Sequence, residues 1–298
     1  MKLSLSLLPS IAFGAYCHGS PKPDAARNEM PIITEPPVFE REIQNAKLYW
    51  SDSGNNRISI VHVWGTPYEM GFAQGRIVKD RLVGFITTLW DYMIDEITHE
   101  LNEFNPDLPD WFVEDIAQGG LEWALEKTTN ITQEFTPEYF NQELRGMADA
   151  SGLDFKMMQQ IHMLGELTKG ACSMMGAWNE AIASGKGLLQ FRTLDWDMSG
   201  PFRDYPHITV YHPTNGNAFA NVGWTGWVGS LTGMNDQQMA ISEIGASYAD
   251  ETFGFESRKG IPFTYILRDV LQWDKSLEDS KKRMKEADRT CNLILGLF

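Results

Sequence analysis

The chain has 298 residues, 43% of them hydrophobic and 12% aromatic, which is enough to bury a sizeable core in one large domain or two small ones. Its 40 acidic and 25 basic residues give a formal net charge of −15. A surface this acidic repels phosphate backbones and anionic membranes, so we expect no nucleic-acid partner.

The N-terminus has the pattern of a secretory signal peptide over residues 1–19. One lysine is followed by a short apolar stretch and then by small residues, and we expect cleavage between about residues 14 and 19. A loosely apolar N-terminus without a targeting role is the alternative. The stretch is too short to span a membrane, and no later apolar run is long enough to do so. The pattern therefore predicts a secreted or lysosomal protein.

In a secreted chain, Asn130 of the triplet "NIT" is a candidate N-glycosylation site, although such triplets also occur by chance.

Residues 20–56 are rich in proline and polar residues, which predicts an exposed lead-in. The next segment, "RISIVHVWG" (57–65), alternates and is rich in β-branched residues, so we expect a strand. Residues 57–298 are then expected to form a single domain.

Helices dominate the first part of that domain, 57–171. Thr66 is the expected N-cap of the first helix, and Glu69 completes a capping box. Apolar residues between Ile77 and Ile97 recur at helical spacing, and Gly84 is the expected bend in this long helix. Three further helices are predicted, over 106–128, from Thr136 to Gly152, and from Asp154 onward.

From Cys172 onward the hydrophobic period changes to that of strands. Short alternating runs separated by Gly, Asn and Pro predict a largely antiparallel sheet, with "NEAIASGKG" (179–187) as the first hairpin loop. Two helices follow, beginning at Pro262 and at a Ser276 cap. The last run, "NLILGLF", is either a buried final strand or a strand cut short inside a sheet. This order of elements predicts an α+β fold, with 172–298 as its strand-rich part.

The three cysteines are Cys17, Cys172 and Cys291. Cys17 leaves with the predicted signal peptide or lies beside its cut. Cys172 is then a buried structural residue, half of a disulfide with Cys291, or a nucleophile. A thiol needs a nearby base to become a nucleophile. His162 is the nearest upstream histidine, and its helical neighbours favour an ordinary packed side chain.

A chain cut before Cys172 would place a new α-amino group on the nucleophile's own residue. Such an amine titrates near neutral pH and can take the thiol proton through one water. The small residues Gly170 and Ala171 suit such a cut. These residues alone still favour a buried structural cysteine.

Six segments, in this order, resemble the cysteine-type N-terminal-nucleophile (Ntn) hydrolases. They are "GTPYEMGFAQGR" (65–76), "YFNQELRGMADASGL" (139–153), "CSMMGAW" (172–178), "GLLQFRTLDWD" (187–197), "VGWTGWVGSLTGMNDQQMAIS" (222–242) and "RTCNLILG" (289–296). The chain is most similar to the acyl-coenzyme A:6-aminopenicillanic acid acyltransferase family, to which acid ceramidase and N-acylethanolamine acid amidase are related. The resemblance covers roughly residues 57–298.

The resemblance implies an αββα sandwich and a precursor that cuts itself between Ala171 and Cys172. Cys172 then takes the nucleophile position, with its own α-amine as the base. Arg192 matches the arginine of the family's Arg-x-x-Asp segment, and Asp195 matches its aspartate. Chemically, Arg192 can favour thiolate or orient a substrate carbonyl, and Asp195 can hold the α-ammonium. Asn292 resembles the family's oxyanion donor, although an asparagine that opens a strand is an equal alternative. Thr193 departs from the usual asparagine of this segment.

One geometric difficulty accompanies this assignment. Residues three apart on a regular strand point to opposite faces, so Arg192 and Asp195 share a site only if the strand ends or bulges near Thr193. Two other polar residues are open to interpretation. Glu243 is either a site carboxylate or an exposed strand end, and Asn235 is more consistent with a turn. Tryptophans of "WGTPYEMG" and "GWTGWVG" either line an acyl pocket or, as we expect, pack in the core or in turns.

The function predicted on this basis is a self-processing amidohydrolase or acyltransferase that acts on an N-acyl or lipid-amide substrate through a thioester. No cofactor is required, acyl-coenzyme A is a donor only by analogy, and the cleaved chains are expected to stay associated. A non-catalytic or truncated member of the fold that acts as a binding protein is the alternative. A metal-dependent hydrolase using Asp195, Asp197, His207 and His212 is a remote one.

Overall fold

The computed structural model describes residues 35–51, 57–102, 110–167, 171–182, 187–195, 200–245, 258–290 and 293–298. All of them belong to one compact unit, Glu35–Phe298. The predicted signal peptide (1–19) lies outside these residues, as do Cys17, Cys291 and Asn292. Helices and mostly antiparallel strands occur in separate runs along the unit, β1–β3, α1–α7, β4–β9, α8–α9 and β10, which confirms the predicted α+β class.

The first helix, α1 (Pro67–Ile77), begins at the predicted capping box, in which Thr66 and Glu69 exchange hydrogen bonds. It ends at Val78, and α2 (Lys79–Asn102) starts directly afterwards. The expected bend at Gly84 is therefore wrong, because the chain turns six residues earlier. Gly84 instead faces the Tyr205 hydroxyl, which lies 2.9 Å from where a β-carbon would stand.

Helix α1 crosses α5 (Glu138–Ser151) at very short range. A β-carbon at Gly71 would lie 2.0 Å from the Glu143 carbonyl oxygen, and one at Gly146 would lie 2.3 Å from the Tyr68 carbonyl oxygen. The two glycines therefore permit a backbone contact that no larger residue allows. Helix α5 ends at Gly152, as predicted, where φ is 84°.

The other helices of this half are shorter than expected. The segment predicted over 106–128 forms α3 (Asp110–Gly119) and α4 (Leu121–Gln133), separated at Gly120, where φ is 83°. Asp154 caps α6 (Phe155–Ile161) by accepting a hydrogen bond from the Met157 amide at 2.8 Å, as predicted. The helix then breaks before α7 (Leu164–Leu167).

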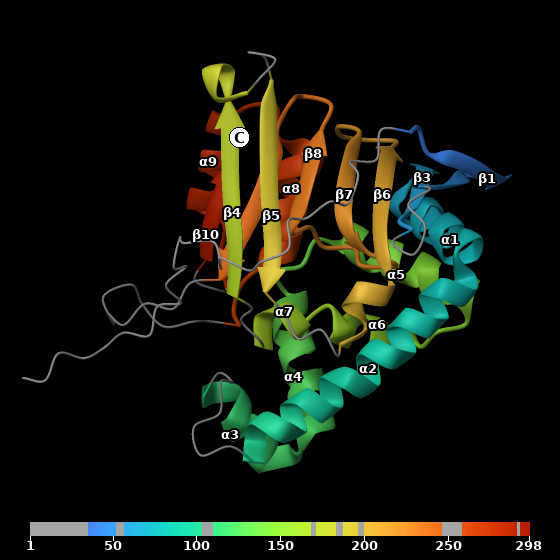
Figure 1. The fold of residues 1–298 in the computed structure, drawn as a ribbon. Coiled ribbons are helices and arrows are strands. Elements are labelled where there is room, and N and C mark those ends of the chain that lie inside the picture. Colours follow the sequence, from blue (N-terminus) through green and yellow to red (C-terminus); the bar gives the residue numbers. More distant parts are fainter. Residues whose placement is uncertain are drawn as a thin grey trace, which may run out of the picture. The chain divides into compact units, whose positions relative to one another are not determined.

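An eight-stranded sheet forms the centre of the unit, in the order β1-β2-β3-β6-β7-β8-β9-β10 (Figure 1). Neighbouring strands are antiparallel except β3 and β6, which are parallel. The strands are β1 (Val38–Ile43), β2 (Ala46–Trp50), β3 (Ser59–Gly65), β6 (Pro206–Pro213), β7 (Phe219–Trp224), β8 (Thr232–Asn235), β9 (Ala240–Gly245) and β10 (Leu293–Leu297).

Two of these strands lie where the sequence predicted an exposed lead-in. Residues 38–50 form strands rather than a lead-in outside the domain, because β1 and β2 pair with each other and β2 pairs with β3, although residues 38–42 are exposed as predicted. Ala46 and Leu48 are each only 1% exposed. The alternation "AKLYW" carries a strand pattern, but the preceding prolines led us to expect a loop.

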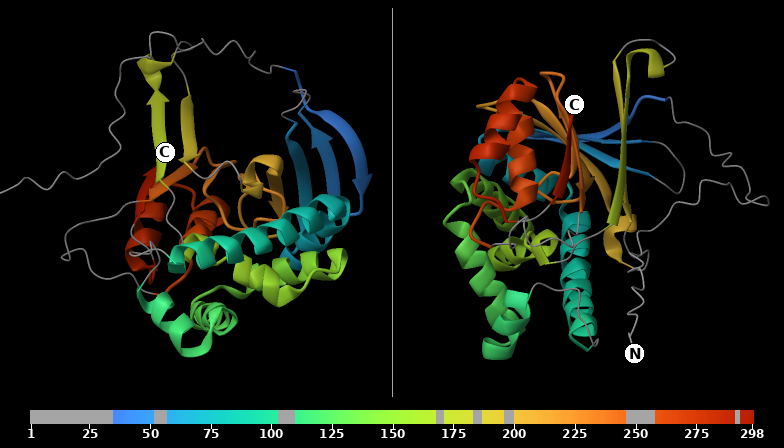
Figure 2. Two further views of the ribbon diagram at one scale, coloured as in Figure 1. Left: turned by 60° about the horizontal axis from the view of Figure 1, so that its bottom comes forward. Right: turned by 90° about the vertical axis from the view of Figure 1, so that its left-hand side faces the viewer.

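A separate hairpin, β4 (Ala171–Trp178) and β5 (Leu188–Asp195), packs against β9. Ser242 of β9 contacts Met174 of β4, whereas Gly233 of β8, on the alternate face of the sheet, contacts Leu271 of α8 (Phe263–Trp273). The hairpin and α8 therefore cover opposite faces. Figure 2 shows α8 and α9 (Leu277–Glu286) on one side of the sheet and the hairpin on the other.

The predicted start at Pro262 and the Ser276–Asp279 cap are confirmed as the beginnings of α8 and α9. Two short 3-10 turns complete the described elements, Asn179–Ala181 and Pro201–Asp204. Within the described part of the chain, no helix combines the length and apolar character that membrane spanning requires.

Candidate active site

The predicted nucleophile lies at the second residue of β4, where it meets two charged side chains. The Arg192 Nη2 group donates to the Cys172 Sγ at 3.4 Å, and the Sγ lies 3.9 Å from the Glu243 Oε1. Arg192 also pairs with Glu243 at 2.5 Å and donates to the Glu243 carbonyl oxygen at 3.3 Å. Within the described residues Cys172 keeps its thiol, and its side chain is half-buried.

The register of the β4–β5 hairpin explains why Cys172 and Arg192 meet. Cys172 stands opposite Leu194, and Met174 stands opposite Arg192, so Cys172 and Arg192 are diagonal neighbours on one face. That face lies toward β9, which supplies Glu243. A hairpin that folds locally and a strand distant in sequence therefore build the site together.

Burial and charge act on the thiol in opposite directions. Burial raises the pKa of Cys172, the Arg192 guanidinium lowers it, and the Glu243 carboxylate raises it again. Burial also raises the pKa of Glu243, and Arg192 opposes this effect. The net result keeps Cys172 protonated, so a nucleophilic role requires a base that removes its proton.

Asp195 lies at the end of β5, directly opposite Ala171, and its side chain is exposed. Strand β5 has no bulge at Thr193, so Arg192 and Asp195 point to opposite faces, as expected for residues three apart on a regular strand. The two residues therefore do not meet at the thiol. Asp195 lies instead beside the Ala171–Cys172 peptide, where a cut would create the new α-amine.

The sequence left two roles open for Glu243, a site carboxylate or an exposed strand end. The structure rules out the exposed strand end. Its side chain is 5% exposed and contacts both Arg192 and Cys172. No local signal distinguishes it from other strand glutamates, because its partners are 51 and 71 residues away.

Asn292 lies outside the described residues, and its oxyanion role remains a prediction. The next residue, Leu293, pairs with Gly245, whose backbone makes a hydrogen bond that lowers the pKa of Cys172.

His162 is a structural residue, as expected. It is 1% exposed, its Nδ1 lies 2.7 Å from the Met158 carbonyl oxygen, and its Nε2 accepts from the Val228 amide at 3.0 Å. The ring stacks on Trp227. Burial lowers the pKa of His162 to about 4, so the ring stays neutral, with its proton on Nδ1.

The residues of the metal hypothesis do not converge. His207 is buried and lies 2.6 Å from the Ser59 hydroxyl, whereas His212 lies on the other face of β6, 3.0 Å from the His62 ring. Asp197 lies outside the described residues. The described part of the chain contains no group of three or more His, Cys, Asp or Glu side chains placed to hold a metal ion.

Asn235 and Trp227 have structural roles. The Asn235 amide donates to the carbonyl oxygens of Leu271 and Asp274, and its Oδ1 accepts from the Met239 amide, which stabilises the β8–β9 turn. Trp227 is 4% exposed within the core.

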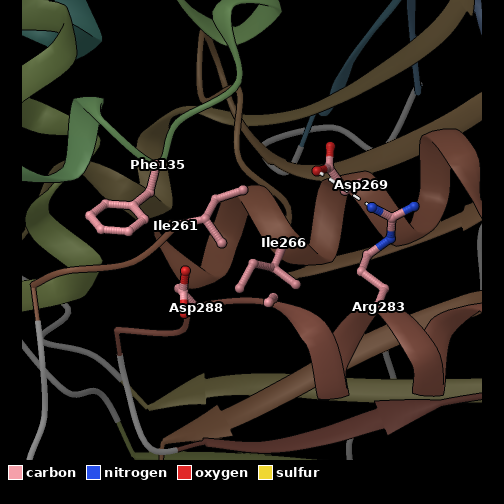
Figure 3. A pocket seen from close by; sticks show the side chains of 7 residues that line it. Phe135, Ile261, Ile266, Asp269, Arg283 and Asp288 are labelled. Carbon is pink, nitrogen blue, oxygen red and sulfur yellow. Dashed lines mark ion pairs between the residues drawn. The ribbon is translucent and has the colours of Figure 1, made fainter.

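A pocket of about 220 Å³ lies between α8 and α9 and shares no residue with the Cys172 site (Figure 3). Burial raises the pKa of its Asp269 to about 6, and the Tyr139 hydroxyl donates to this carboxylate. Arg283 on the same wall is already paired with Asp274 at 2.6 Å. Arg283 also lies 3.8 Å from Asp269, so these two charged groups of the pocket already have partners.

No protein-family model matches the chain. The chain is similar to curated proteins of two organisms. Protein dcd1A of Dictyostelium discoideum is 37% identical over 279 residues, which cover 91% of this chain and 62% of that protein. Protein dcd1B of the same organism is 36% identical over 270 residues, covering 90% and 53%.

An uncharacterized protein of Archaeoglobus fulgidus is 25% identical over 266 residues, which cover 81% of this chain and 41% of that protein. The chain thus spans between two fifths and three fifths of the length of these relatives.

Proposed function

We propose that the chain is an N-terminal-cysteine amidohydrolase or acyltransferase that activates itself by cleavage between Ala171 and Cys172. The observation that carries this proposal is the contact of the Cys172 thiol with Arg192 and Glu243 at the start of β4. The Arg192 guanidinium beside the half-buried thiol can stabilise a thiolate once a base removes the thiol proton, which is what a nucleophilic cysteine requires.

Self-cleavage would begin with attack of the Cys172 sulfur on the Ala171 carbonyl carbon. The carbon–nitrogen bond then breaks, the proton that left the thiol passes to the Cys172 nitrogen, and residue 171 is held as a thioester on the Cys172 sulfur. Water attacks this thioester, which releases the Ala171 carboxylate and restores the thiol. The products are a chain ending at Ala171 and a second chain beginning with the amine of Cys172.

The new α-amine supplies a base for the thiol of its own residue. It accepts the thiol proton through one water, and the thiolate attacks the acyl carbonyl of the substrate. The Arg192 guanidinium stabilises the thiolate, and Asp195 holds the α-ammonium from the neighbouring strand. The side-chain amide of Asn292 is proposed to donate to the oxyanion. Collapse expels the amine of the substrate and leaves an acyl thioester for water or an acceptor amine.

We also propose that the fold is the αββα sandwich of the Ntn hydrolases. Helix α8 covers one face of the eight-stranded sheet and the hairpin covers part of the other, which supplies three of the four layers. The outer face of the hairpin is apolar, with Met175 and Leu189 each 62% exposed and Phe191 52% exposed. An apolar face of this kind suits a further covering layer.

That same apolar face favours the alternative function, a binding protein that acts without catalysis. Exposed apolar side chains on a two-stranded hairpin are typical of surfaces that associate with another polypeptide. In either case we propose a secreted or lysosomal location. The substrate of the enzyme would be an N-acyl or lipid amide, and no cofactor takes part in the steps proposed.

A thioester-trapping experiment tests the enzymatic proposal. The secreted protein is incubated with a panel of fluorogenic N-acyl amides, quenched in acid and analysed by mass spectrometry. We expect amine release and an acyl adduct on the peptide that begins with Cys172, and neither with Cys172→Ala. Full activity in excess chelator is expected. A folded protein that is cleaved yet releases no amine and forms no adduct would favour the binding protein.

A further inference from the structure

We infer that Asn130 carries an N-linked glycan, that its first sugars lie in a hollow along α4, and that it is attached before α4 folds. The inference rests on the secretory location proposed above. Asn130 begins the only Asn-x-Ser/Thr triplet in the chain, so any N-linked glycan must be attached there.

The asparagine side chain is exposed and opens onto a hollow of about 660 Å³. This volume falls within the range of about 300–1,000 Å³ that is common for ligand pockets. The lining residues are Trp123, Glu126, Lys127, Asn130, Ile131, Glu134 and Lys259. A group attached to Asn130 therefore enters a concave surface rather than open solvent.

Helix geometry directs that group along the hollow. Side chains on an α-helix tilt toward its N-terminus, so a glycan leaving Asn130 passes Lys127 and runs toward Trp123. Trp123 lies seven residues earlier on the same stripe of α4, about 10 Å along the helix axis. The two sugars closest to the asparagine span a comparable length.

The chemistry of the lining also suits sugars. Lys127 donates hydrogen bonds, Glu126 and Glu134 accept them, and sugar hydroxyls do both. Trp123 is 40% exposed and lines the hollow, although Gly119 and Lys127 pack against its ring, so its exposed ring edge provides the apolar contact for a sugar. The Lys127 ammonium lies over this ring at 4.6 Å and pairs with Asp115 at 2.7 Å, which leaves its other N–H donors to meet a sugar oxygen.

Thr132, the third residue of the triplet, explains why the glycan must be attached before α4 folds. Thr132 is 1% exposed, and its hydroxyl donates to the Thr129 carbonyl oxygen at 2.9 Å. Transfer of an N-glycan requires access to this hydroxyl in an extended chain. Folded α4 therefore hides the acceptor signal, while Asn130 points outward and its glycan does not oppose folding.

The test is expression in a eukaryotic secretory system, once with the chain's own N-terminus and once with an added signal peptide. We expect a mass decrease on treatment with peptide N-glycosidase, mapped to Asn130, and no decrease with Asn130→Gln. A secreted protein without this glycan would overturn the inference. Asn130→Gln should still be cut before Cys172. A glycosylated protein that is never cut would instead contradict the catalytic proposal alone.

Two further measurements address the hollow and the order of attachment. Under native conditions we expect an endoglycosidase to release the glycan severalfold faster from Trp123→Ala than from wild type, with Trp178→Ala as the control for loss of an exposed tryptophan. Equal rates would refute the placement of the first sugars in the hollow.

An oligosaccharyltransferase should modify the denatured, unglycosylated protein but not the native one. Equal modification of both would refute attachment before folding.

Discussion

Within the described residues, two buried arginine–glutamate pairs have the same 2.5 Å separation but very different surroundings. Arg268 and Glu143 are each 1% exposed, and the rings of Phe140, Tyr211 and Phe219 surround the guanidinium. Arg192 and Glu243 are 7% and 5% exposed, and their neighbour is the Cys172 thiol.

The difference separates a stabilising pair from a reactive one. The remaining hydrogen-bonding groups of the first pair are largely used inside the core, since the Tyr211 hydroxyl donates to Glu143 and Arg268 donates to the Val228 carbonyl oxygen. Arg192 instead directs a donor at the sulfur and lies on a hairpin attached to the unit mainly through β9. The first pair should therefore control stability, and the second should control reactivity.

The largest effect on stability is expected for Arg268→Met. It leaves Glu143 as an uncompensated charge in the core, which should lower the free energy of unfolding by about 3–5 kcal/mol. Urea denaturation measures this loss. The double variant Arg268→Met/Glu143→Gln should recover part of it, and a single variant as stable as wild type would contradict the structural role.

Arg192→Met should affect chemistry more than stability. Loss of a charged donor at the reacting group lowers the cleavage rate before Cys172 by about 100-fold, by analogy with the loss of one oxyanion donor. The rate is followed by gel after synthesis in a cell-free system. Arg192→Lys keeps the charge but loses the forked geometry, so an intermediate rate is expected. Wild-type cleavage in Arg192→Met would remove this residue from the site.

Two buried histidines should weaken the protein in acid. The folded pKa is about 4 for His162 and about 3 for His207, both below the ordinary value of 6.5. The unfolded chain therefore binds more protons below pH 6.5, and stability falls as the pH decreases through this window. Each histidine should lower the free energy of unfolding by roughly 2 kcal/mol between pH 7 and pH 5.

Urea denaturation of wild type and of His162→Gln/His207→Gln at several pH values measures this slope. The double variant should be less stable at pH 7 but should show a flatter pH dependence. An unchanged slope would mean that other groups dominate acid unfolding.

Glu243→Gln should produce the smallest change, a lower pKa of Cys172. The carboxylate raises that pKa by repelling the thiolate, and its removal also leaves Arg192 without a competing anion. The pH dependence of iodoacetamide alkylation of Cys172 reports the change. A pKa that stays the same or rises would show that Glu243 does not act on the thiol through its charge.

Local features were predictable from sequence because the residues that make them are neighbours. The caps at Thr66, Asp154 and Ser276 each depend on a side chain and a backbone amide three residues away. The hairpin that brings Arg192 to Cys172 depends on one loop, so its pairing also followed from the pattern of strands and turns.

Long-range features could not be predicted in the same way. The parallel pairing of β3 with β6 joins residues nearly 150 positions apart, and nothing in either strand specifies the other. Glu243 reaches the site through the packing of β9 on the hairpin, which the sequence of β9 does not show. The strands β1 and β2 were missed because composition upstream of them outweighed their own alternation.

The account depends most on creation of a new N-terminus at Cys172, which N-terminal sequencing and intact mass of the secreted protein measure together. We expect two associated chains, one beginning at Cys172, and a single uncut chain for Cys172→Ala. A wild-type protein that hydrolyses an N-acyl amide while residues 171 and 172 remain joined would contradict the account, because the thiol would then act without the α-amine as its base.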